Sequence, residues 1–427
     1  MDKEWFFDNA KKLLLSMRKI SAGTVLLMWA LAMISGVFIY KLVSGNNPAK
    51  KEITMTFATW WDDELEGETF SALCSEYQVQ NPGITIKLEK LNWDTIQELL
   101  EKKDSKDSNK NAQKINPPDI FSIDPYAVYE LEKKSLLAKL EDDRNFTGNI
   151  VSIISFINPL YYNIGLLQDA GFDRPPKNQT EFLSYVQRIK ETGKFGAGIA
   201  LSDLRHVNQQ LLSWIWAAVG NPDVSSSFAS KEVIDTLNFL NLLYQNLYDN
   251  PFELSKAKLL EAFGKGEIGM MIGSIADIRE IKRTNINFSI TTIPAPVSYT
   301  KKPVFPLSVW YVGIYSKSEY QEEAKDFILF LKKKSGEIAA AAYAVPGNGT
   351  LDRELSKEDL YYAKAFDMYE AGEMVRELYH SQNISQFNDI IIREVRFMFQ
   401  GSKTPKECAE AIQYNWENLA GITPAVP

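Results

Sequence analysis

The chain has 427 residues and a mass of 48.5 kDa, which is more than one ordinary hydrophobic core contains, so two packed lobes are expected. Its composition, 45% apolar and 24% charged, is typical of a folded globular protein. The formal net charge of -8 is spread along the chain without a basic stripe, which argues against a nucleic-acid partner. Two His and two Cys are too few for a zinc cluster.

The N-terminal segment predicts a membrane anchor. Residues 20–43, ISAGTVLLMWALAMISGVFIYKLV, carry no charge before Lys41 and are long enough to cross a bilayer as a helix. Shortly before this stretch come the basic residues Lys11, Lys12, Arg18 and Lys19, so residues 1–19 are expected in the cytoplasm and the bulk of the chain outside it. A cleaved signal peptide is the alternative. The only A-x-A triplet of this N-terminal segment, residues 30–32, lies inside the apolar stretch, where a peptidase would not reach it.

After a polar linker at residues 44–51, strand and helix patterns alternate, which predicts an α/β domain with a mainly parallel sheet. Period-two alternation and short apolar runs predict strands at 53–59, 84–88, 118–124, 196–201, 266–274, 286–296 and 308–316. Helical spacing predicts helices at 70–77, 96–100, 207–219 and 231–247, and another that begins at Thr180. Beyond residue 321 the pattern is almost wholly helical.

One glycine pattern imitates a dinucleotide fingerprint. Gly264, Gly266 and Gly269 have G-x-G-x-x-G spacing. The fingerprint works only where it follows a strand and opens a helix, because the helix N-terminus faces the pyrophosphate. Here the predicted helix comes first and the strand second. The pattern therefore predicts no dinucleotide, and no other cofactor is predicted. No metal is predicted either, because the chain has only two His and two Cys.

Unusual side chains follow two of the predicted strands. Trp60, Trp61 and Asp62 come after the first strand, and Asp124 and Tyr126 come after the third. In open α/β sheets the ligand crevice lies beyond the carboxyl ends of the strands, so neighbouring parallel strands would bring these groups to one ligand.

Aromatic faces combined with carboxylates suit a carbohydrate, because the C–H patches of a pyranose pack on flat rings while its hydroxyls donate to carboxylate oxygens. Two later segments carry similar aromatic pairs, namely Trp214 with Trp216 and Trp310 with Tyr311. Since Trp214 and Trp216 are two apart on a helix, only one of them can face a given cleft. Trp93 and Trp416 lie within amphipathic patterns and are assigned to packing.

The ordered set of these segments resembles the family 1 extracellular solute-binding proteins of ABC importers, whose best-known relatives bind maltose and other oligosaccharides. The matching pieces span residue 52 to about residue 350. They are ITMTFATWW, FSALCSEYQVQNPGITIKLEKLNW, PPDIFSIDPYAVYELEKKSLLAKLED, LYYNIGLLQDAGFDRPPKNQTEFLSYVQRIKETG, AFGKGEIGMMIGS and PLSVWYVGIYSKSEYQEEAKDFILFL.

The resemblance implies a two-lobed, type II periplasmic-binding-protein-like fold that closes on its ligand by a hinge motion. It places residues 52–155 and 276–320 in the first lobe, and 156–275 and 321–427 in the second. Cys74 and Cys408 then fall in different lobes, so no disulfide between them is expected. Importer permease subunits and a sugar or oligosaccharide are the implied partners of an expected monomer.

The resemblance also implies that the cleft residues bind the ligand and release it unchanged, so no catalytic residue is predicted. The candidate ligand-binding residues are Trp60, Trp61, Asp62, Asp124, Tyr126, Trp214, Trp216, Ser274, Asp277, Trp310 and Tyr311.

Two other functions are open to the same residues. A glycan hydrolase would use two of Asp62, Glu64, Asp124 and Asp277 as acid and base, at a fixed short separation across the cleft. A sensor or adhesin would use the lobes without an importer. A sensor would need a signalling domain on the cytoplasmic side, where only residues 1–19 are expected, so an importer partner is preferred.

Overall fold

The computed structural model describes residues 52–61, 65, 68–101, 116–140, 148–220, 228–299, 302–347, 359–376 and 383–420. The predicted anchor at residues 20–43 lies outside the described residues. Within the described residues, no helix has both the length and the apolar character needed to cross a membrane. Residues from Thr54 onward belong to one compact unit, which contains both sheets described below.

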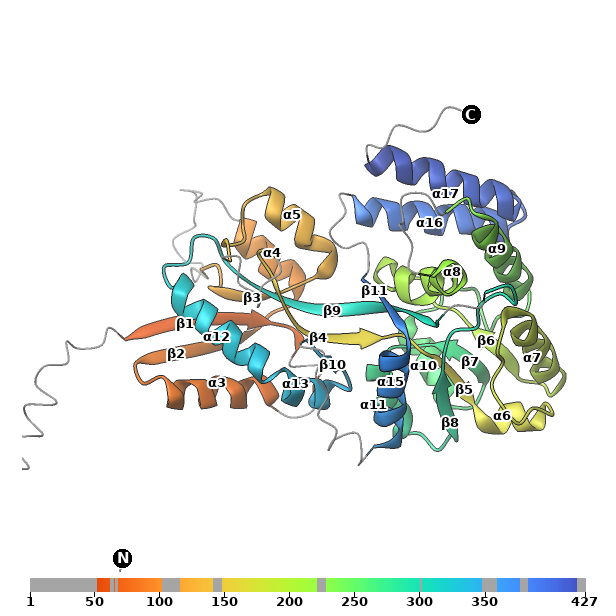
Figure 1. Cartoon of the computed structure of the whole chain (residues 1–427), viewed down its shortest axis with the longest axis horizontal. Helices are drawn as coiled ribbons and strands as arrows, with labels where there is room; N and C mark the ends of the chain where they lie inside the picture. Colours follow the sequence, from red (N-terminus) through yellow and green to blue (C-terminus); the bar gives the residue numbers. More distant parts are fainter. Residues whose placement is uncertain are drawn as a thin grey trace, which may run out of the picture. The chain divides into compact units, whose positions relative to one another are not determined.

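The first sheet has seven strands in the order β10-β4-β9-β3-β1-β2, and β11 also pairs with β9 (Figure 1). Its strands are β1 (Ile53–Thr59), β2 (Ile84–Lys90), β3 (Ile120–Ile123), β4 (Val151–Ile157), β9 (Val304–Ile314), β10 (Val345–Pro346) and β11 (Glu373–Arg376). The helices that belong with it are α3 (Thr69–Gln80), α4 (Trp93–Glu101), α5 (Val128–Lys133), α12 (Gln321–Lys333) and α13 (Ser335–Ala342).

The second sheet has four strands in the order β6-β7-β5-β8. They are β5 (Leu160–Asn163), β6 (Phe195–Gly198), β7 (Ile268–Ile272) and β8 (Phe288–Thr291). The helices of this part are α6 (Ile164–Asp169), α7 (Gln179–Glu191), α8 (Ser213–Val219), α9 (Lys231–Tyr244), α10 (Lys256–Gly264), α11 (Ile278–Lys282), α15 (Leu360–Ala371), α16 (Ile384–Phe399) and α17 (Pro405–Ala420). Helices α16 and α17 pack on each other and on α9 (Figure 1).

Strand direction differs from the sequence prediction. Strand β1 is parallel to β3, with Phe57 opposite Ile120, but β9 is antiparallel to both β3 and β4. In the second sheet β5 is antiparallel to both of its neighbours. The prediction of a mainly parallel sheet is therefore wrong. Hydrophobic alternation shows where a strand occurs, but the direction of the strand depends on the path of the chain between strands.

The chain passes between the two sheets at points other than the three predicted boundaries, which follow residues 155, 275 and 320. It leaves the first sheet after Ile157 and enters the second at Leu160. Strand β8 pairs with β5 in the second sheet, whereas α12 and α13 pack on strands of the first. The structure thus differs from the predicted lobe boundaries at residues 276–299 and 321–347. The amphipathic pattern of a helix shows which of its faces is apolar, and does not show which sheet covers that face.

Several helices begin where the sequence carries a capping residue. The Asn178 side chain accepts from the Glu181 N–H, and Ser230 and Ser255 cap α9 and α10 in the same way. Helix α10 is followed by β7, so the glycine pattern there runs from helix to strand, as predicted. The pattern is therefore not a dinucleotide-binding fingerprint, which requires the strand before the helix.

The two cysteines are buried free thiols. Cys74 lies on the buried face of α3 with Phe70, Leu73 and Tyr77. Cys408 belongs to the core of the second part, where burial raises the pKa of its thiol to about 12.

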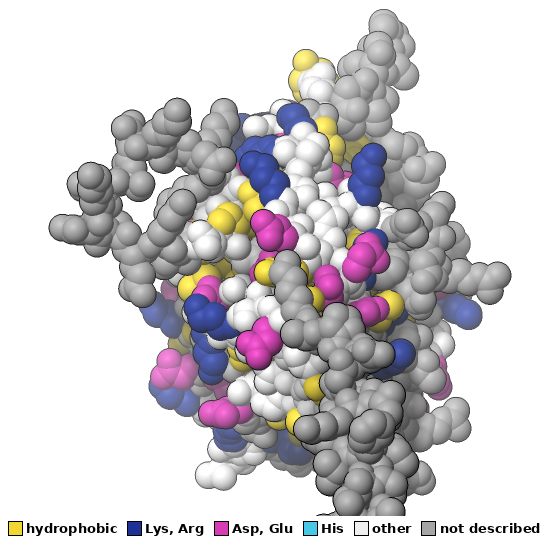
Figure 2. Space-filling view, turned by 90° about the vertical axis from the view of Figure 1, so that its left-hand side faces the viewer, with side chains coloured by type: hydrophobic (Ala, Val, Ile, Leu, Met, Phe, Trp, Pro, Cys, Tyr) yellow, Lys and Arg dark blue, Asp and Glu magenta, His cyan; other side chains and the backbone are white. Residues whose placement is uncertain are grey.

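Figure 2 shows acidic and basic side chains interspersed on one face of the molecule. In the described part of the chain, no group of three or more His, Cys, Asp or Glu side chains is placed to hold a metal ion.

Candidate functional site

A cavity of about 760 Å³, which we call the first chamber, is lined on one side by strands, helices and connecting segments that belong with the first sheet, and on the other by helices and connecting segments that belong with the second sheet. We call the two sheets, each together with its helices and connecting segments, the first part and the second part of the molecule. Its volume lies in the range of small-molecule sites, about 300–1,000 Å³. The residues contributed by the first part are Trp60, Asn92, Trp93, Asp124, Pro125, Tyr126, Phe156, Ser308, Val309 and Trp310. Those contributed by the second part are Arg205, His206, Gln209, Lys256, Ala257, Leu260, Ser274, Ala276, Asp277 and Glu280.

The wall contributed by the first part is aromatic. Trp60 and Trp93 meet edge to face with ring centroids 5.9 Å apart, and Trp60 meets Trp61 in the same way at 6.1 Å. Trp61 stacks on Trp310 at 4.6 Å, with the two planes 7° apart. Phe156 completes the row, 5.2 Å from Trp310. Four of these five rings line the first chamber, and the fifth, Trp61, is fully buried behind Trp310. We call this row the aromatic wall.

The parallel pairing of β1 and β3 places the two predicted strand ends at one edge of the first sheet. Trp60 follows β1 and Asp124 follows β3, and both line the first chamber. The Asp124 Oδ1 accepts from the Tyr126 N–H at 2.9 Å, which caps the short helix that Pro125 opens. Burial raises the pKa of the Asp124 carboxyl, although the hydrogen bond from the Tyr126 N–H opposes this.

The opposite wall is polar and begins at the end of β7. Gly273 lets the chain turn closely there, because a Cβ would lie 2.8 Å from the Tyr161 ring and 2.9 Å from the Asp277 Oδ2. Ser274 and Asp277 then form a capping box, in which the Asp277 Oδ2 accepts from the Ser274 N–H at 2.7 Å. The Asp277 Oδ1 lies 2.9 Å from the Lys256 Nζ. The Asp277 carboxylate therefore stabilises the turn after β7 and also pairs with the Lys256 ammonium.

A second cation of this wall is also paired. The Arg205 guanidinium donates to both carboxylate oxygens of Asp203, at distances of 2.7–3.1 Å. Tyr126, from the first part, donates its hydroxyl to the Arg205 carbonyl at 3.4 Å. Three carboxylates, those of Asp124, Asp277 and Glu280, line the first chamber together with these two cations. The described lining of the first chamber, taken over both walls, therefore carries more acidic than basic side chains.

A π-helical turn, Asn208–Leu212, brings Gln209 to the first chamber. The Gln209 Nε2 donates at 2.9 Å to the Asn158 Oδ1. Asn158 is fully buried and lies between β4 and β5, where the chain passes from the first sheet to the second. The chamber wall and the crossing are therefore joined by one amide pair.

Acidification is expected to destabilise the fold through His206. Burial, and after it the charge of Lys256, lowers the pKa of the imidazole; Arg205 also lowers it, while Asp203 and Asp277 oppose the change. Since the folded pKa lies below the unfolded value of about 6.5, the unfolded chain binds more protons between the two values. This contribution to stability is complete above about pH 6.5 and is lost as the pH falls toward the folded pKa.

Urea unfolding of the full-length chain, followed across this pH window, measures the effect. The His206→Gln variant should lose less free energy of unfolding than the natural chain over the same window. Equal losses in both proteins would show that His206 does not titrate in the way described.

The structure brings six of the predicted site residues to the first chamber, namely Trp60, Asp124, Tyr126, Ser274, Asp277 and Trp310. Their contact with a ligand stays a prediction. Asp62 lies outside the described residues. Trp61 does not reach the chamber surface, because its ring is covered by Trp310. Tyr311, next to Trp310 on β9, is buried and does not line the chamber.

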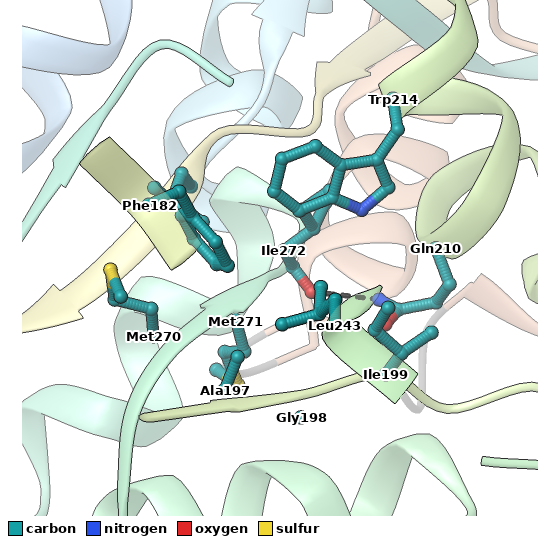
Figure 3. Close-up of a pocket in the computed structure, with 11 residues that line it drawn as sticks. Phe182, Ala197, Gly198, Ile199, Gln210, Trp214, Leu243, Met270, Met271 and Ile272 are labelled. Atoms are coloured by element: carbon teal, nitrogen blue, oxygen red, sulfur yellow. Dashed lines mark hydrogen bonds between the residues drawn. The ribbon is translucent and has the colours of Figure 1, made fainter. Parts of the chain in front are cut away.

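Trp214 and Trp216 also differ from the prediction, because both are only 2% exposed and belong to the core of the second part. Figure 3 shows Trp214 in an interior space beside Phe182, and that space has no volume open to a water molecule. Nearby, the Gln210 Nε2 donates to the Ile272 carbonyl at 2.7 Å. Helix α8 packs on α9, and residues 213–218 of α8 are all buried, so neither tryptophan ring is open to a ligand.

Sequence reasoning missed several residues of the chamber. Trp93 was assigned to packing, yet it lines the first chamber. The rule that found Trp60 would have found it too, because Asn92 and Trp93 come directly after β2, at the edge where β1 ends. Among the other lining residues that the sequence analysis does not predict are Phe156, Arg205, His206, Gln209, Lys256 and Glu280. No local signal marked these, since only the fold places them opposite the aromatic wall.

Comparison with known proteins agrees with this architecture. Residues 61–338 match the family model of the bacterial extracellular solute-binding proteins. A binding protein of Brucella abortus is 22% identical over 295 residues, which cover 62% of this chain and 68% of that protein. The sn-glycerol-3-phosphate-binding periplasmic protein UgpB of Agrobacterium fabrum is 24% identical over 278 residues, covering 59% of this chain and 62% of UgpB.

Among solved structures, the GacH receptor of Streptomyces glaucescens has a similar fold. It was solved unliganded and in complex with acarbose and an acarbose homolog. Its TM-score to this chain is 0.67 at 17% identity, over 86% of this chain and 98% of GacH. The resemblance to the family 1 solute-binding proteins of ABC importers is confirmed by these matches. Because the matched residues make up more than half of the chain, and both sheets fit the two-lobed α/β fold, this protein belongs to the bacterial extracellular solute-binding proteins.

Proposed function

We propose that this protein captures an uncharged carbohydrate in the first chamber and delivers it to an ABC importer, while a helix at residues 20–43 holds the chain at the membrane. The observation that carries the proposal is the aromatic wall facing a polar wall across one chamber. Flat rings accept the C–H faces of a sugar ring, and side chains such as Asp277, Gln209 and Asp124 accept or donate at its hydroxyl edge.

The charges of the chamber favour an uncharged sugar over a phosphate ester. UgpB, a relative, is named for sn-glycerol 3-phosphate, so both solute classes need consideration. A phosphate group needs cations that are available to it. Here Lys256 is paired with Asp277 and Arg205 with Asp203, while Glu280 and Asp124 add negative charge to the wall. A phosphate entering the chamber would have to displace these carboxylates, whereas sugar hydroxyls can hydrogen-bond to them.

The first experiment is calorimetric titration of the purified full-length chain with neutral mono- and oligosaccharides and with sn-glycerol 3-phosphate. We expect at least one neutral sugar to bind, with a change in tryptophan fluorescence, and the phosphate ester to bind more weakly. Absence of binding across a broad panel of neutral sugars would contradict the carbohydrate proposal, and hydrolysis of a bound glycan would favour an enzyme. Recovery of the full-length chain in the soluble fraction of cells would contradict the membrane tether.

Substituting Asp277 should change this selectivity. In Asp277→Asn, the side-chain oxygen can still accept from the Ser274 N–H, but the Lys256 ammonium loses its carboxylate partner. We expect affinity for sn-glycerol 3-phosphate to rise by about tenfold, the effect of one added charge-assisted hydrogen bond. Calorimetry on the double variant Asp277→Asn, Lys256→Met provides the control, because it should lose the gain. Unchanged phosphate affinity in Asp277→Asn would show that the ion pair does not set charge selectivity.

A further inference from the structure

A second cavity of about 700 Å³, which we call the second chamber, adjoins the first. The two share four lining residues, namely Trp93, Asp124, Tyr126 and Arg205. The residues that line the second chamber alone are Gln97, Ala127, Glu130, Ser202, Asp203, Leu204, Ser385 and Asn388. Each chamber alone has the volume of a complete small-molecule site. A ligand that extends past the shared residues would occupy both.

One wall of the second chamber comes from α16, which contributes Ser385 and Asn388. The family match ends at residue 338, so this wall lies outside the part of the chain that defines the family. Asn388 is 2% exposed, and its Oδ1 has no hydrogen-bond partner among the described residues. A buried amide oxygen without a donor is costly, and a ligand hydroxyl beside it would relieve that cost.

The chemistry of the second chamber matches that of the first. Trp93 offers an aromatic surface to both chambers, and Gln97, Ser202 and Ser385 add neutral hydrogen-bonding groups. The Arg205 guanidinium at the junction is already held by Asp203. The two rings, those of Trp93 and Tyr126, the neutral polar groups and the paired cation suit a second uncharged, hydroxyl-rich unit. The carboxylates that also line this chamber, those of Asp124, Glu130 and Asp203, disfavour an anion.

We propose that the second chamber binds the further units of an extended neutral oligosaccharide, whose first unit lies against the aromatic wall. This inference rests on the proposed carbohydrate function. It adds that α16 contacts the distal end of the ligand, so that chain length is a property the protein recognises.

The test is calorimetric titration of the full-length chain with four series of oligosaccharides from one to six units: α-1,4-glucan, β-1,4-glucan, β-1,4-xylan and fructan. In the series that binds, we expect at least a tenfold rise in affinity once the chain is long enough to pass Trp93 and Tyr126. The variant Ser385→Phe, which fills the second chamber from an exposed position, should remove this rise and leave the affinity for the shortest binding sugar unchanged.

Gln386→Phe is the matched control, because Gln386 is the exposed neighbour on α16 and does not line the chamber. It should behave as the natural chain does at every length. A flat dependence of affinity on length, or equal weakening of short and long sugars by Ser385→Phe, would overturn the second-chamber proposal while leaving carbohydrate binding in place. Failure of all four series at every length would overturn both proposals.

Discussion

Replacing Trp310 by alanine is expected to weaken sugar binding by about 1–3 kcal/mol, which is about 5- to 150-fold in Kd. Trp310 is half-buried, lines the first chamber and is held between Trp61 and Phe156. Its ring therefore has one covered face and one part that a sugar can reach. Alanine removes the stacking surface at the middle of the aromatic wall. Titration calorimetry with the sugar that binds the natural chain measures the loss.

Two comparisons separate a loss of binding from a loss of folding. Trp310→Phe keeps a ring at the same place and should retain part of the affinity that alanine loses. Thermal unfolding of each variant shows whether the protein is folded at the titration temperature, since the contact with Trp61 also contributes to packing. A folded Trp310→Ala protein with an unchanged Kd would exclude this ring from the binding site.

Replacing Trp214 by alanine should have the opposite effect, a large loss of stability with the affinity of the folded protein retained. Trp214 is packed against Phe182 and Phe239, with ring centroids 5.1 and 5.0 Å away. Truncating a fully buried tryptophan leaves a cavity and costs about 3–5 kcal/mol. Urea denaturation measures this directly, and the sugar titration is repeated on the fraction that remains folded.

The matched control for stability is Tyr414→Ala, which removes an aromatic ring that is 59% exposed in the same part of the molecule. It should change the free energy of unfolding by less than about 0.5 kcal/mol. Trp214→Phe should cost less than alanine, because the phenyl ring fills part of the cavity. Losing the indole N–H of Trp214 removes no hydrogen bond, since it has no partner among the described residues. If Trp214→Ala stayed as stable as the natural chain and lost sugar affinity, the original prediction of a cleft residue would be reinstated.

The sequence predicted the parts of the site that depend on a single strand end. Trp60 and Asp124 each follow a strand, and the parallel pairing of β1 with β3 brings both to the first chamber. Trp93 obeys the same rule after β2, but its helical spacing predicts packing. The amphipathic pattern of a helix does not separate a residue under the helix from one at its first turn, which can face a cleft.

The opposite wall could not be predicted in the same way. Lys256 opens α10 and Arg205 lies in a short turn, and neither position differs in sequence from an ordinary surface site. Their place across from the aromatic wall depends on strand direction and on which helices cover which sheet. For the same reason Trp214 and Trp216 were mistaken for cleft residues, since an aromatic pair on a helix has the same pattern in a core.

The stacking of Trp61 behind Trp310 bears on the affinity with which a ligand is bound. A lone indole at a surface samples several rotamers, and a ligand that uses it must freeze that motion on arrival. Here the second ring, lying flat against the first at 4.6 Å, restricts the rotamer when the chain folds. The platform is preorganised, so less conformational entropy is lost at the moment of association than a freely rotating side chain would lose.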